Sequence, residues 1–372
     1  MTKILHISTR HNVGGIGKLI LELLSDRDFD QNYLTGVCGL NEKELPFEMD
    51  TKKYTLTRIQ TLRREIRFIN DISSLLKIRK VLRQERPDIV HTHMSKAGVL
   101  GRLAALSLMQ KPKLIHSYHG HVLDGYFNKT ITSIFTRIER LLGMKTEVFV
   151  FDGNQTRNEL IALNIRPRLK QVVILPGLIR SFPSDKFNSA RDYWGNILVV
   201  ARIEQVKRID IVLEVAAILK KDFPNTNFRI TIVGDGSLRE RLERTSREMA
   251  LPIEFLGWKD NLDQEYKKAS IFLSVSEAEG TPIAFMEAAA FGCPIVSTKV
   301  GSVEDLVDHN KTGILCGSDP NELAYTISKL IDSPNTLIEL GHNARKKAEA
   351  EFGINMFLSE HANLYQGILS NS

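Results

Sequence analysis

The chain has 372 residues, of which 42% are apolar, so it is too long for one ordinary hydrophobic core and we expect two α/β domains. Its three cysteines include no CxxC pair, which argues against a disulfide framework or a structural zinc site and favours a reducing cytoplasm. The net charge of +6 is uneven, because residues 1–180 carry 29 Lys+Arg against 17 Asp+Glu. With no basic and apolar leader, and no apolar run near the roughly 18 residues that cross a bilayer, we expect neither secretion nor a membrane span.

The first predicted element is a strand at residues 3–8, followed by a glycine-rich loop and a helix that runs through Leu24. Glycines in such a loop let backbone N–H groups approach a phosphate, so Gly14 and Gly15 are candidate phosphate contacts. As a dinucleotide fingerprint the loop is incomplete, because Ile20 stands where the third glycine belongs and no acidic residue closes the next strand.

The most basic stretch is residues 52–86, with 11 basic and 3 acidic residues. Apolar residues recur between the charges at helical spacing, which predicts one or two amphipathic helices. One interpretation is a solvated helix face, and the other is an electrostatic contact with anionic lipid or a phosphate-bearing acceptor. Nucleic acid is disfavoured as a partner, because no binding motif or aromatic interleaving accompanies the charge. The basic residues concerned include Arg58, Arg63, Arg64, Arg67, Lys77, Arg79, Lys80, Arg83 and Arg86.

Two further strands, at residues 88–93 and 113–118, are predicted to lead into histidines. Ser95 follows the first strand and can cap a helix whose small residues allow close packing on the sheet. Ligands of open α/β sheets bind at such strand ends. For each histidine the ordinary alternative is a hydrogen-bonded core or rim residue, and no carboxylate or cysteine at familiar spacing completes a metal site. The histidines concerned are His91, His93, His119 and His121.

Strands at residues 146–151 and 171–175 are predicted to complete the first domain. A linker marked by proline and glycine then extends to Asn188. The second domain restarts with a strand at residues 196–201, which is followed by the cations Arg202, Lys207 and Arg208. Taken alone, these cations are ordinary surface residues.

Two more predicted strands of the second domain, at residues 227–233 and 253–256, run into glycine turns. Gly234 begins the first turn and Gly257 the second. Trp258 then follows either as a contact for a nucleotide base or as a packed aromatic residue.

The stretch from Ser274 to Ser297 is the most informative part of the sequence. An apolar run at residues 271–275 leads into it and predicts a buried strand, and a loop and an alanine-rich helix follow. Thr281 is expected to cap this helix and Pro282 to stand in its first turn, which would make the free N–H groups of the helix an anion site. Two carboxylates, Glu279 and Glu287, flank the site. Taken one at a time, they are ordinary solvated acids of a βα unit.

Taken together, Glu-Gly-Thr-Pro-Ile-Ala-Phe-Met-Glu from Glu279 to Glu287, the following Ala-Ala-Ala-Phe-Gly-Cys-Pro-Ile-Val and then Val300-Gly301-Ser302 resemble the paired-glutamate signature of retaining GT-B glycosyltransferases of family 4. Residues 88–120 and 196–303 carry the most specific parts of the resemblance. In that family the first glutamate contacts hydroxyls of the donor sugar, and the second binds the ribose.

The resemblance also implies roles for other matched positions. In the family, the loop matched by Gly280, Thr281 and Pro282 offers backbone N–H groups near the donor sugar and diphosphate. The strand-end histidine, here His119, contacts the donor sugar near the reacting centre, and the cations matched by Arg202 and Lys207 grip the diphosphate. The remaining candidates are Gly14, Gly15, Gly234, Gly257 and Trp258 on the donor side, and Asp124 and Tyr126 on the acceptor side.

We therefore expect a GT-B fold of two Rossmann-like parallel-sheet domains that face a central cleft. Residues 1–180 would bind the acceptor, residues 181–353 the nucleotide-sugar, and residues 354–372 would form a helix that crosses back to the first domain. The implied reaction is retaining transfer from a nucleotide-sugar, with UDP the commonest nucleotide in the family, to a saccharide or a polyprenyl-diphosphate-linked saccharide in polysaccharide synthesis.

No cofactor or metal is expected, because no Asp-x-Asp motif stands at a predicted strand end. The expected location is cytoplasmic, and adsorption to the inner face of the plasma membrane through residues 52–86 is a hypothesis.

Three alternatives stay open at this point. A nucleotide-sugar 2-epimerase shares the fold but converts its substrate without an acceptor. A nicotinamide dehydrogenase requires a better glycine fingerprint than this chain has. A nucleic-acid-binding protein would use the basic half of the chain and leave the two glutamates unexplained.

Overall fold

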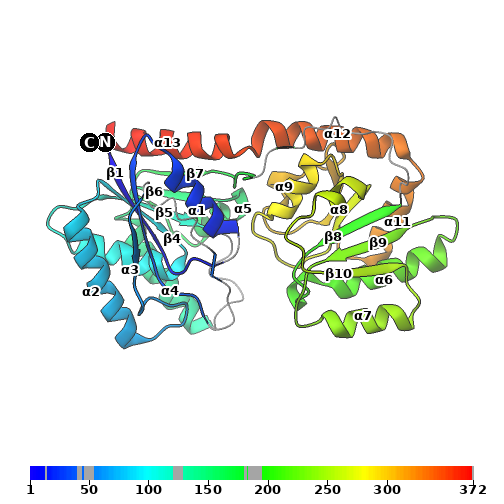
Figure 1. The fold of residues 1–372 in the computed structure, drawn as a ribbon, viewed down its shortest axis with the longest axis horizontal. Coiled ribbons are helices and arrows are strands. Elements are labelled where there is room, and N and C mark those ends of the chain that lie inside the picture. The colour runs from blue at the N-terminus through cyan, green and yellow to red at the C-terminus, as the bar shows by residue number, and fades with distance from the viewer. Residues whose placement is uncertain are drawn as a thin grey trace. The chain divides into compact units, whose positions relative to one another are not determined.

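The computed structural model describes residues 1–12, 15–39, 44–45, 54–119, 129–179, 182 and 195–370. Backbone contacts divide the chain into two units, and Figure 1 shows the elements of each. Unit 1 consists of Met1–Ile179 together with Ile354–Ser372, and unit 2 is Arg180–Gly353. Each unit contains a parallel sheet, as the alternation of strands and helices along the sequence predicts.

The described residues of unit 1 form a seven-stranded parallel sheet with the order β3-β2-β1-β4-β5-β6-β7. Its strands are β1 (Lys3–Ser8), β2 (Asp30–Thr35), β3 (Leu56–Arg58), β4 (Ile89–His93), β5 (Lys113–Tyr118), β6 (Val148–Phe151) and β7 (Lys170–Val173). Its helices are α1 (Gly15–Ser25), α2 (Phe68–Glu85), α3 (Ser95–Leu106), α4 (Lys129–Gly143), α5 (Asn154–Ala162) and α13 (Ile354–Ser370).

Successive residues of the unit 1 strands contribute to different layers, because side chains alternate between the faces of a sheet. Ile4 and Ile89 pack in one cluster with α1 and α13, whereas Leu5 and Val90 pack in another with α2 and α3. Close packing of α3 depends on small residues, since a Cβ added at Gly98 would lie 2.4 Å from the His116 ring. Unit 1 is therefore a three-layer α/β/α structure that includes the last helix of the chain.

The described residues of unit 2 form a six-stranded parallel sheet with the order β10-β9-β8-β11-β12-β13. Its strands are β8 (Asn196–Val200), β9 (Arg229–Val233), β10 (Ile253–Gly257), β11 (Ile271–Ser274), β12 (Ile295–Thr298) and β13 (Gly313–Cys316). Its helices are the 3₁₀ turn η1 (Gln205–Lys207), α6 (Ile209–Asp222), α7 (Arg239–Glu248), α8 (Asp263–Lys268), α9 (Ile283–Ala290), α10 (Val303–Leu306), α11 (Pro320–Ile331) and α12 (Pro334–Glu351).

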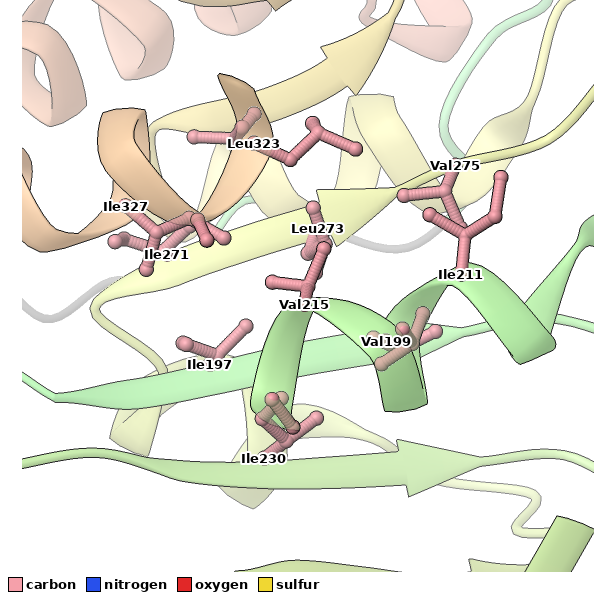
Figure 2. Packing of buried hydrophobic residues seen from close by; sticks show 14 of the residues in the cluster. Ile197, Val199, Ile211, Val215, Ile230, Ile271, Leu273, Val275, Leu323 and Ile327 are labelled. Carbon is pink, nitrogen blue, oxygen red and sulfur yellow. The ribbon is translucent and has the colours of Figure 1, made fainter. Parts of the chain in front are cut away.

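Branched aliphatic residues dominate the core of unit 2 (Figure 2). Ile197 of β8 and Leu273 of β11 pack against Val215 of α6, and α11 adds Leu323 and Ile327 to the same cluster. Strands covered on both faces need nearly continuous apolar runs, and the sequences of β8 and β11 provide them. This core supports the strand ends at which the predicted site residues lie.

Helix starts were harder to predict than the helices themselves. We expected Ser95 to cap α3, but Met94 occupies the cap position with a φ of 64° and Ser95 is the first helical residue. Thr281 was expected to cap α9 with Pro282 in its first turn, but Pro282 is itself the cap residue and the helix begins at Ile283. In neither helix does the cap residue's side chain bond to the helix, so both caps were wrong.

The basic stretch forms a single helix, α2, after the short strand β3. One side of α2 packs on unit 1 through Ile78 and Leu82. A different stripe, formed by Ile69, Ile72 and Leu76, is exposed. This apolar stripe is unusual, because the spacing that predicts the helix would ordinarily place such residues in the core.

Candidate active site

Glu279 and Lys207, two of the residues singled out in the sequence, meet in unit 2. Lys207 is the last residue of η1, and its Nζ donates to both carboxylate oxygens of Glu279 at 2.7 Å. Ser276, in the loop after β11, donates its hydroxyl to Glu279 Oε1 at 2.6 Å. The side chains of Lys207 and Glu279 keep 16% and 9% of their surface exposed, so the pair is mostly dehydrated but within reach of solvent.

The backbone holds this pair from two sides. The N–H of Glu277 donates to the carbonyl of Val206 at 2.9 Å, which joins the loop after β11 to η1. The hydroxyl of Thr298, at the end of β12, donates to the carbonyl of Ser276 at 2.8 Å. Both contacts fix the loop that carries Glu279 without using its carboxylate.

Gly301 completes the support for this loop. Its φ is +62°, and a Cβ added there would lie 1.9 Å from the carbonyl oxygen of Glu279. Only glycine fits this conformation and this close approach. The Val300-Gly301-Ser302 part of the sequence motif therefore has a structural reason, which is to let the chain after β12 pass against the Glu279 loop.

The other cations predicted for the diphosphate differ in their surroundings. Arg202 follows β8 and is exposed. Arg208 instead forms ion pairs with Asp210 at 2.9 Å and Glu277 at 2.5 Å, and these hydrogen bonds raise its pKa. Arg208 is thus the least available of these cations, because two carboxylates already bind it, whereas the carboxylate partner of Lys207 is Glu279.

Two predicted glycines make sharp turns at neighbouring strand ends. Gly234 has a φ of +139° and Gly257 a φ of +72°, and the N–H of Gly234 donates to the carbonyl of Gly257 at 2.9 Å. Trp258 follows with 63% of its surface exposed, and its indole N–H donates to Asp260 at 3.2 Å. The alternative that Trp258 is a packed core aromatic is therefore wrong.

The second glutamate of the motif, Glu287, lies within α9 and is half-buried. The hydroxyl of Tyr266, a buried residue of α8, donates to Glu287 Oε2 at 2.9 Å. Gly280, Thr281 and Pro282 form the loop between the two glutamates and are also half-buried. The loop and Glu279 thus lie just before α9 in the chain and Glu287 lies within the helix, and the proposed binding roles of these residues stay predictions.

The predicted residues of unit 1 lie partly around a cavity of about 750 Å³. Gly15, at the start of α1, and His119, directly after β5, contribute to its wall. Arg64 and Lys96 add positive charge, and Glu65 adds a carboxylate. Gly14, His121, Asp124 and Tyr126 lie outside the described residues.

Four histidines of unit 1 contact one another along the sheet. His6 on β1 is the register partner of His91 on β4, and the Nδ1 of His6 lies 3.0 Å from the Nε2 of His93. The Nδ1 of His93 lies 3.1 Å from the Nε2 of His119, and the Nδ1 of His119 lies 2.9 Å from Asp152 Oδ2. His121 is not part of the described structure.

Sequence reasoning missed His6 and Asp152, which belong to the same group. The sequence did contain a signal for His6. Side chains alternate between the faces of a strand, so the two-residue spacing from Ile4 to His6 puts both side chains on one face of the sheet. Only the strand order, which sets β1 beside β4, shows that this face is the one that carries His91 and His93.

Burial sets the charge of three of these rings. Burial lowers the pKa of His6 to about 4, and it lowers the pKa of His91 and His93 well below their ordinary value. All three rings are therefore neutral at physiological pH.

Among the described residues, the ring nitrogens of His6, His91 and His93 lie near enough to one another to share a metal ion. Each of these nitrogens already has a hydrogen-bond partner, which for His91 is Tyr365 on one side and Ser117 on the other. The expectation that the reaction needs no metal stays a prediction. Over the part of the chain that is described, no helix combines the length and the apolar composition needed to span a bilayer.

Comparison with known proteins gives two family matches that together extend over most of the chain. The model for glycosyl transferases group 1 matches residues 186–347, and the model for Glycosyltransferase Family 4 matches residues 13–182. The first match lies within unit 2, and the second covers unit 1 from residue 13 to Ile179 and ends at residue 182, at the start of unit 2.

Relatives with curated names cover the chain almost end to end. A UDP-Gal:alpha-D-GlcNAc-diphosphoundecaprenol alpha-1,3-galactosyltransferase from Escherichia coli is 26% identical over 99% of this chain and 98% of its own length. A Campylobacter jejuni alpha-1,4-N-acetyl-D-galactosaminyltransferase, named for an undecaprenol-linked saccharide, is 23% identical over 94% of both chains.

Solved structures share the fold at lower identity. Anabaena HepE in complex with UDP has a TM-score of 0.79 and 18% identity, with 98% of this chain and all of that chain covered. Sucrose-phosphate synthase from Thermosynechococcus elongatus has a TM-score of 0.81 and 19% identity, with both chains covered completely.

Proposed function

Since the chain belongs to the GT-B glycosyltransferases of family 4, also called group 1, we propose that it is a retaining, metal-independent enzyme that moves a sugar from a UDP-sugar to a polyprenyl-diphosphate-linked saccharide. The observation that carries the proposal is the Lys207–Glu279 pair, held at the strand ends of unit 2 beside α9. The two named relatives support the lipid-linked acceptor, and the first of them and HepE support UDP as the nucleotide.

Lys207 and Glu279 suit a reaction whose leaving group is a diphosphate. As the bond between the sugar's anomeric carbon and the phosphate oxygen breaks, the electron pair leaves with the diphosphate and negative charge grows there. Lys207 and Arg202 can balance that charge without a metal ion. The Lys207 ammonium can turn from Glu279 towards the diphosphate, which frees the Glu279 carboxylate to accept hydrogen bonds from sugar hydroxyls.

In a retaining reaction, the acceptor hydroxyl attacks the face from which the diphosphate departs. Its oxygen forms the new bond to the anomeric carbon, and its proton passes to the departing phosphate oxygen. Charge on the sugar is oxocarbenium-like during this step. No carboxylate of this chain is assigned as a covalent nucleophile, because Glu279 is assigned to binding the sugar hydroxyls.

The reaction test is incubation with UDP-sugars, with and without a polyprenyl-diphosphate-linked saccharide. We expect UDP release that depends on the acceptor and a product that keeps the anomeric configuration of the donor, read by NMR. Sugar isomerisation without acceptor would instead identify a 2-epimerase. A thermal-shift screen identifies the nucleotide without relying on turnover, since a ligand at 100 times its dissociation constant stabilises a fold by about 2.7 kcal/mol.

The surface of unit 1 supports a membrane-borne acceptor. Every residue from Arg63 to Ile69 is exposed, and this run contains Arg63, Arg64 and Arg67 beside Phe68. The exposed fractions of Phe68 and Ile69 are 78% and 81%. Apolar side chains flanked by arginines can enter the headgroup region of an anionic leaflet, where each cation contributes about 1 kcal/mol.

Vesicle co-sedimentation tests this surface. We expect binding that needs anionic lipid, weakens at high salt, and is lost when Arg63, Arg64 and Arg67 are all changed to Glu. The matched control makes the same three charge changes on α7 of unit 2, at the exposed residues Arg241, Arg244 and Arg247, and should retain binding. Equal loss in both variants would mean that net charge alone drives adsorption, and a protein that ignores anionic vesicles would favour a soluble acceptor.

A further inference from the structure

Five side chains of unit 1 form one hydrogen-bonded line across the sheet. The line begins at Gln31 on β2, passes through His6, His93 and His119, and ends at Asp152 after β6. Successive contact distances are 2.7, 3.0, 3.1 and 2.9 Å. Neighbouring rings are nearly parallel, with interplanar angles of 17° and 15°. Each of the six ring nitrogens in the line faces one partner within it.

The orientation of Gln31 fixes the direction of the first contact. Its amide Nε2 donates to the backbone carbonyl of Leu23 and lies 3.5 Å from that of Asp26. A flipped amide would set its oxygen against both carbonyl oxygens, so Oε1 faces the Nε2 of His6. An amide oxygen only accepts, and the Nε2 of His6 must therefore carry a hydrogen.

Counting hydrogens along the line then gives one more than neutral rings can supply. Each of the four contacts needs one hydrogen between its two heavy atoms, because facing lone pairs or facing N–H groups repel. Three neutral imidazoles bring three hydrogens, and the Asp152 carboxylate brings none. With an obligatory acceptor at each end, the three rings together must hold a fourth proton.

We propose that this line holds His119 as an imidazolium, and that Gln31, His6 and His93 are its positioning residues. The Nε2–H of His119 donates to His93, and its Nδ1–H donates to Asp152. The proton stays on the ring, because an ordinary imidazole binds a proton more strongly than an ordinary carboxylate by about 2.6 pKa units. His119 is then a fixed cation in the cavity wall, with neither ring nitrogen available as a base.

Burial explains why the extra proton rests on His119 and not deeper in the line. The pKa of His6 is lowered to about 4 by burial, and burial and the neighbouring histidines also lower the pKa of His93. His119 keeps 11% of its surface exposed and lies against the only carboxylate of the line. The charge of an imidazolium–carboxylate pair is thereby placed at the end nearest solvent.

Some of the other titratable and charged groups around His119 favour a positive charge on its ring, and others disfavour it. His91 on β4 and His361 on α13 are buried and neutral, so they add no charge. His116 of β5 is also neutral, because burial and Arg102 lower its pKa. Elsewhere in the cavity wall, Arg64 and Lys96 disfavour a further cation and Glu65 favours one. Lys96 is itself paired with Asp71 at 2.5 Å. The carboxylate of Asp152 is the one in direct contact with the ring.

This inference rests on the proposed function only for its catalytic meaning, since the resemblance assigns His119 to the donor sugar. An imidazolium beside the reacting centre would favour the negative charge of the leaving diphosphate through space and through its polarised C–H edge. The protonation state itself can be measured without donor or acceptor.

The test is NMR of the full chain labelled with ¹⁵N-histidine, which separates a ring nitrogen that carries hydrogen from a bare one. At pH 7.5 we expect two N–H groups on His119, identified by the signal that His119→Gln loses. Gln31→Met keeps a side chain of similar length but removes the obligatory acceptor. The hydrogen bonds along the line can then all reverse and need only three hydrogens, so His119 should show a single N–H at pH 7.5.

The matched control is Tyr365→Phe, which removes a partner of His91 in the same buried layer but outside the line. It should leave the His119 signal unchanged even if it costs stability. A single N–H on His119 in the folded wild-type protein at pH 7.5 would overturn the inference, whatever the enzyme does. Two N–H groups without transfer from any UDP-sugar would leave the inference standing and remove the proposed function.

Discussion

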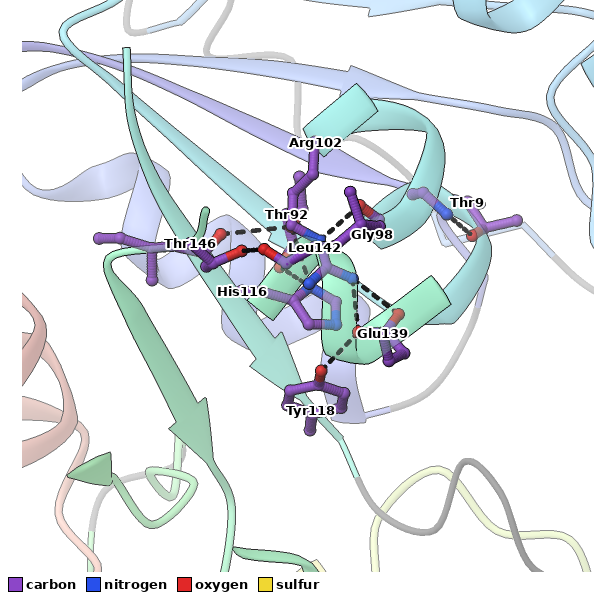
Figure 3. Close-up of polar contacts among 11 residues, drawn as sticks. Thr9, Thr92, Gly98, Arg102, His116, Tyr118, Glu139, Leu142 and Thr146 are labelled. Atoms are coloured by element: carbon purple, nitrogen blue, oxygen red, sulfur yellow. Dashed lines mark hydrogen bonds and ion pairs between the residues drawn. The ribbon is translucent and has the colours of Figure 1, made fainter. Parts of the chain in front are cut away.

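Each unit holds a pair of a cation and a carboxylate joined by two hydrogen bonds, and the two pairs have opposite surroundings. In unit 1, Arg102 of α3 and Glu139 of α4 are 0% and 2% exposed, and the hydroxyl of Tyr118 adds a third hydrogen bond to the carboxylate (Figure 3). In unit 2, Lys207 and Glu279 lie at strand ends and remain partly exposed.

The energetics of the two pairs differ accordingly. Burial alone would lower the pKa of Arg102, but Glu139 and Tyr118 outweigh it and raise the pKa, so the guanidinium stays charged. Burial and the adjacent Glu139 carboxylate raise the pKa of Tyr118 well above its ordinary value, which keeps its hydroxyl as a donor. Such a pair cannot exchange partners without leaving a dehydrated charge. The Lys207–Glu279 pair can, because both side chains keep some contact with solvent.

An ion pair therefore does not indicate function by itself. The two pairs differ in that solvent can reach the Lys207–Glu279 pair near the strand ends of unit 2, whereas the Arg102–Glu139 pair is buried. The four predictions below test this contrast between a buried pair in unit 1 and an accessible pair in unit 2.

The largest effect is expected from acid, and it should fall on unit 1. Its buried histidines have lowered pKa values, about 4 for His6 and His361. Such groups bind protons mainly when unfolded, so the stability they contribute is present above pH 6.5 and lost as the pH falls from 6.5 through about 4. A shift of this size is worth roughly 3 kcal/mol for each histidine.

Hydrogen exchange between pH 7.5 and 4.5 measures the loss of stability in each unit separately. Peptides from β4 of unit 1 should lose protection before peptides from β11 of unit 2. Tryptophan fluorescence serves as the internal control, since both tryptophans, Trp194 and Trp258, belong to unit 2. If both units lost protection at the same pH, the buried histidines would not be what makes unit 1 unstable in acid.

The next largest effect is expected from Glu139→Ala, which leaves Arg102 buried without its carboxylate. We expect a loss of about 3–5 kcal/mol in the free energy of unfolding, measured by urea denaturation. Glu279→Ala should cost under about 2 kcal/mol, because Lys207 can regain water. The double change Arg102→Met with Glu139→Leu should recover most of the loss, and a variant as unstable as Glu139→Ala alone would argue that packing, not charge, is responsible.

Turnover, in contrast to stability, should be more sensitive to changes at the Lys207–Glu279 pair than to changes at the Arg102–Glu139 pair. We expect Glu279→Gln and Lys207→Ala each to lower turnover by roughly 10²-fold or more, as for other groups that position a substrate or stabilise developing charge. Urea denaturation should find both variants folded. If either variant turned over UDP-sugar at the wild-type rate, the residue changed would have no part in the reaction.

The smallest effect is expected from metal removal. Lys207 and Arg202 are proposed to balance the diphosphate, so dialysis against EDTA should leave turnover within about a factor of two. Added Mn²⁺ serves as the control for incomplete removal. An enzyme that works only with Mn²⁺ would place the counter-charge of the diphosphate elsewhere.

Much of the fold could be predicted because strands and helices depend on local patterns. Nearly continuous apolar runs gave β8 and β11 within one residue, and alternation with helices gave parallel sheets. Caps were less predictable, since a proline at the α9 cap and Met94 at the α3 cap depend on how the preceding loop leaves its strand.

The site could be predicted only where the motif is contiguous in sequence. Glu279 and Glu287 were chosen as candidates in this way and their binding roles stay predictions, whereas the Lys207–Glu279 contact spans 72 positions and needed the sheet order. Arg102 and Glu139 read as ordinary helix surface, because nothing local shows that α3 and α4 bring them together. Gln31 gave no signal at all, since its importance lies in which side of its amide faces the Leu23 carbonyl.

The placement of α13 has a consequence for how the protein is made. Phe357, Leu364 and Tyr365 of this helix complete the core that Ile4 and Ile89 begin, yet they leave the ribosome after all of unit 2. Domains commonly fold in the order in which they emerge. Here the first unit to be translated must wait with one face of its sheet only partly covered, by α1, while the second unit is completed. We therefore expect nascent unit 1 to be the part of the chain that a chaperone protects.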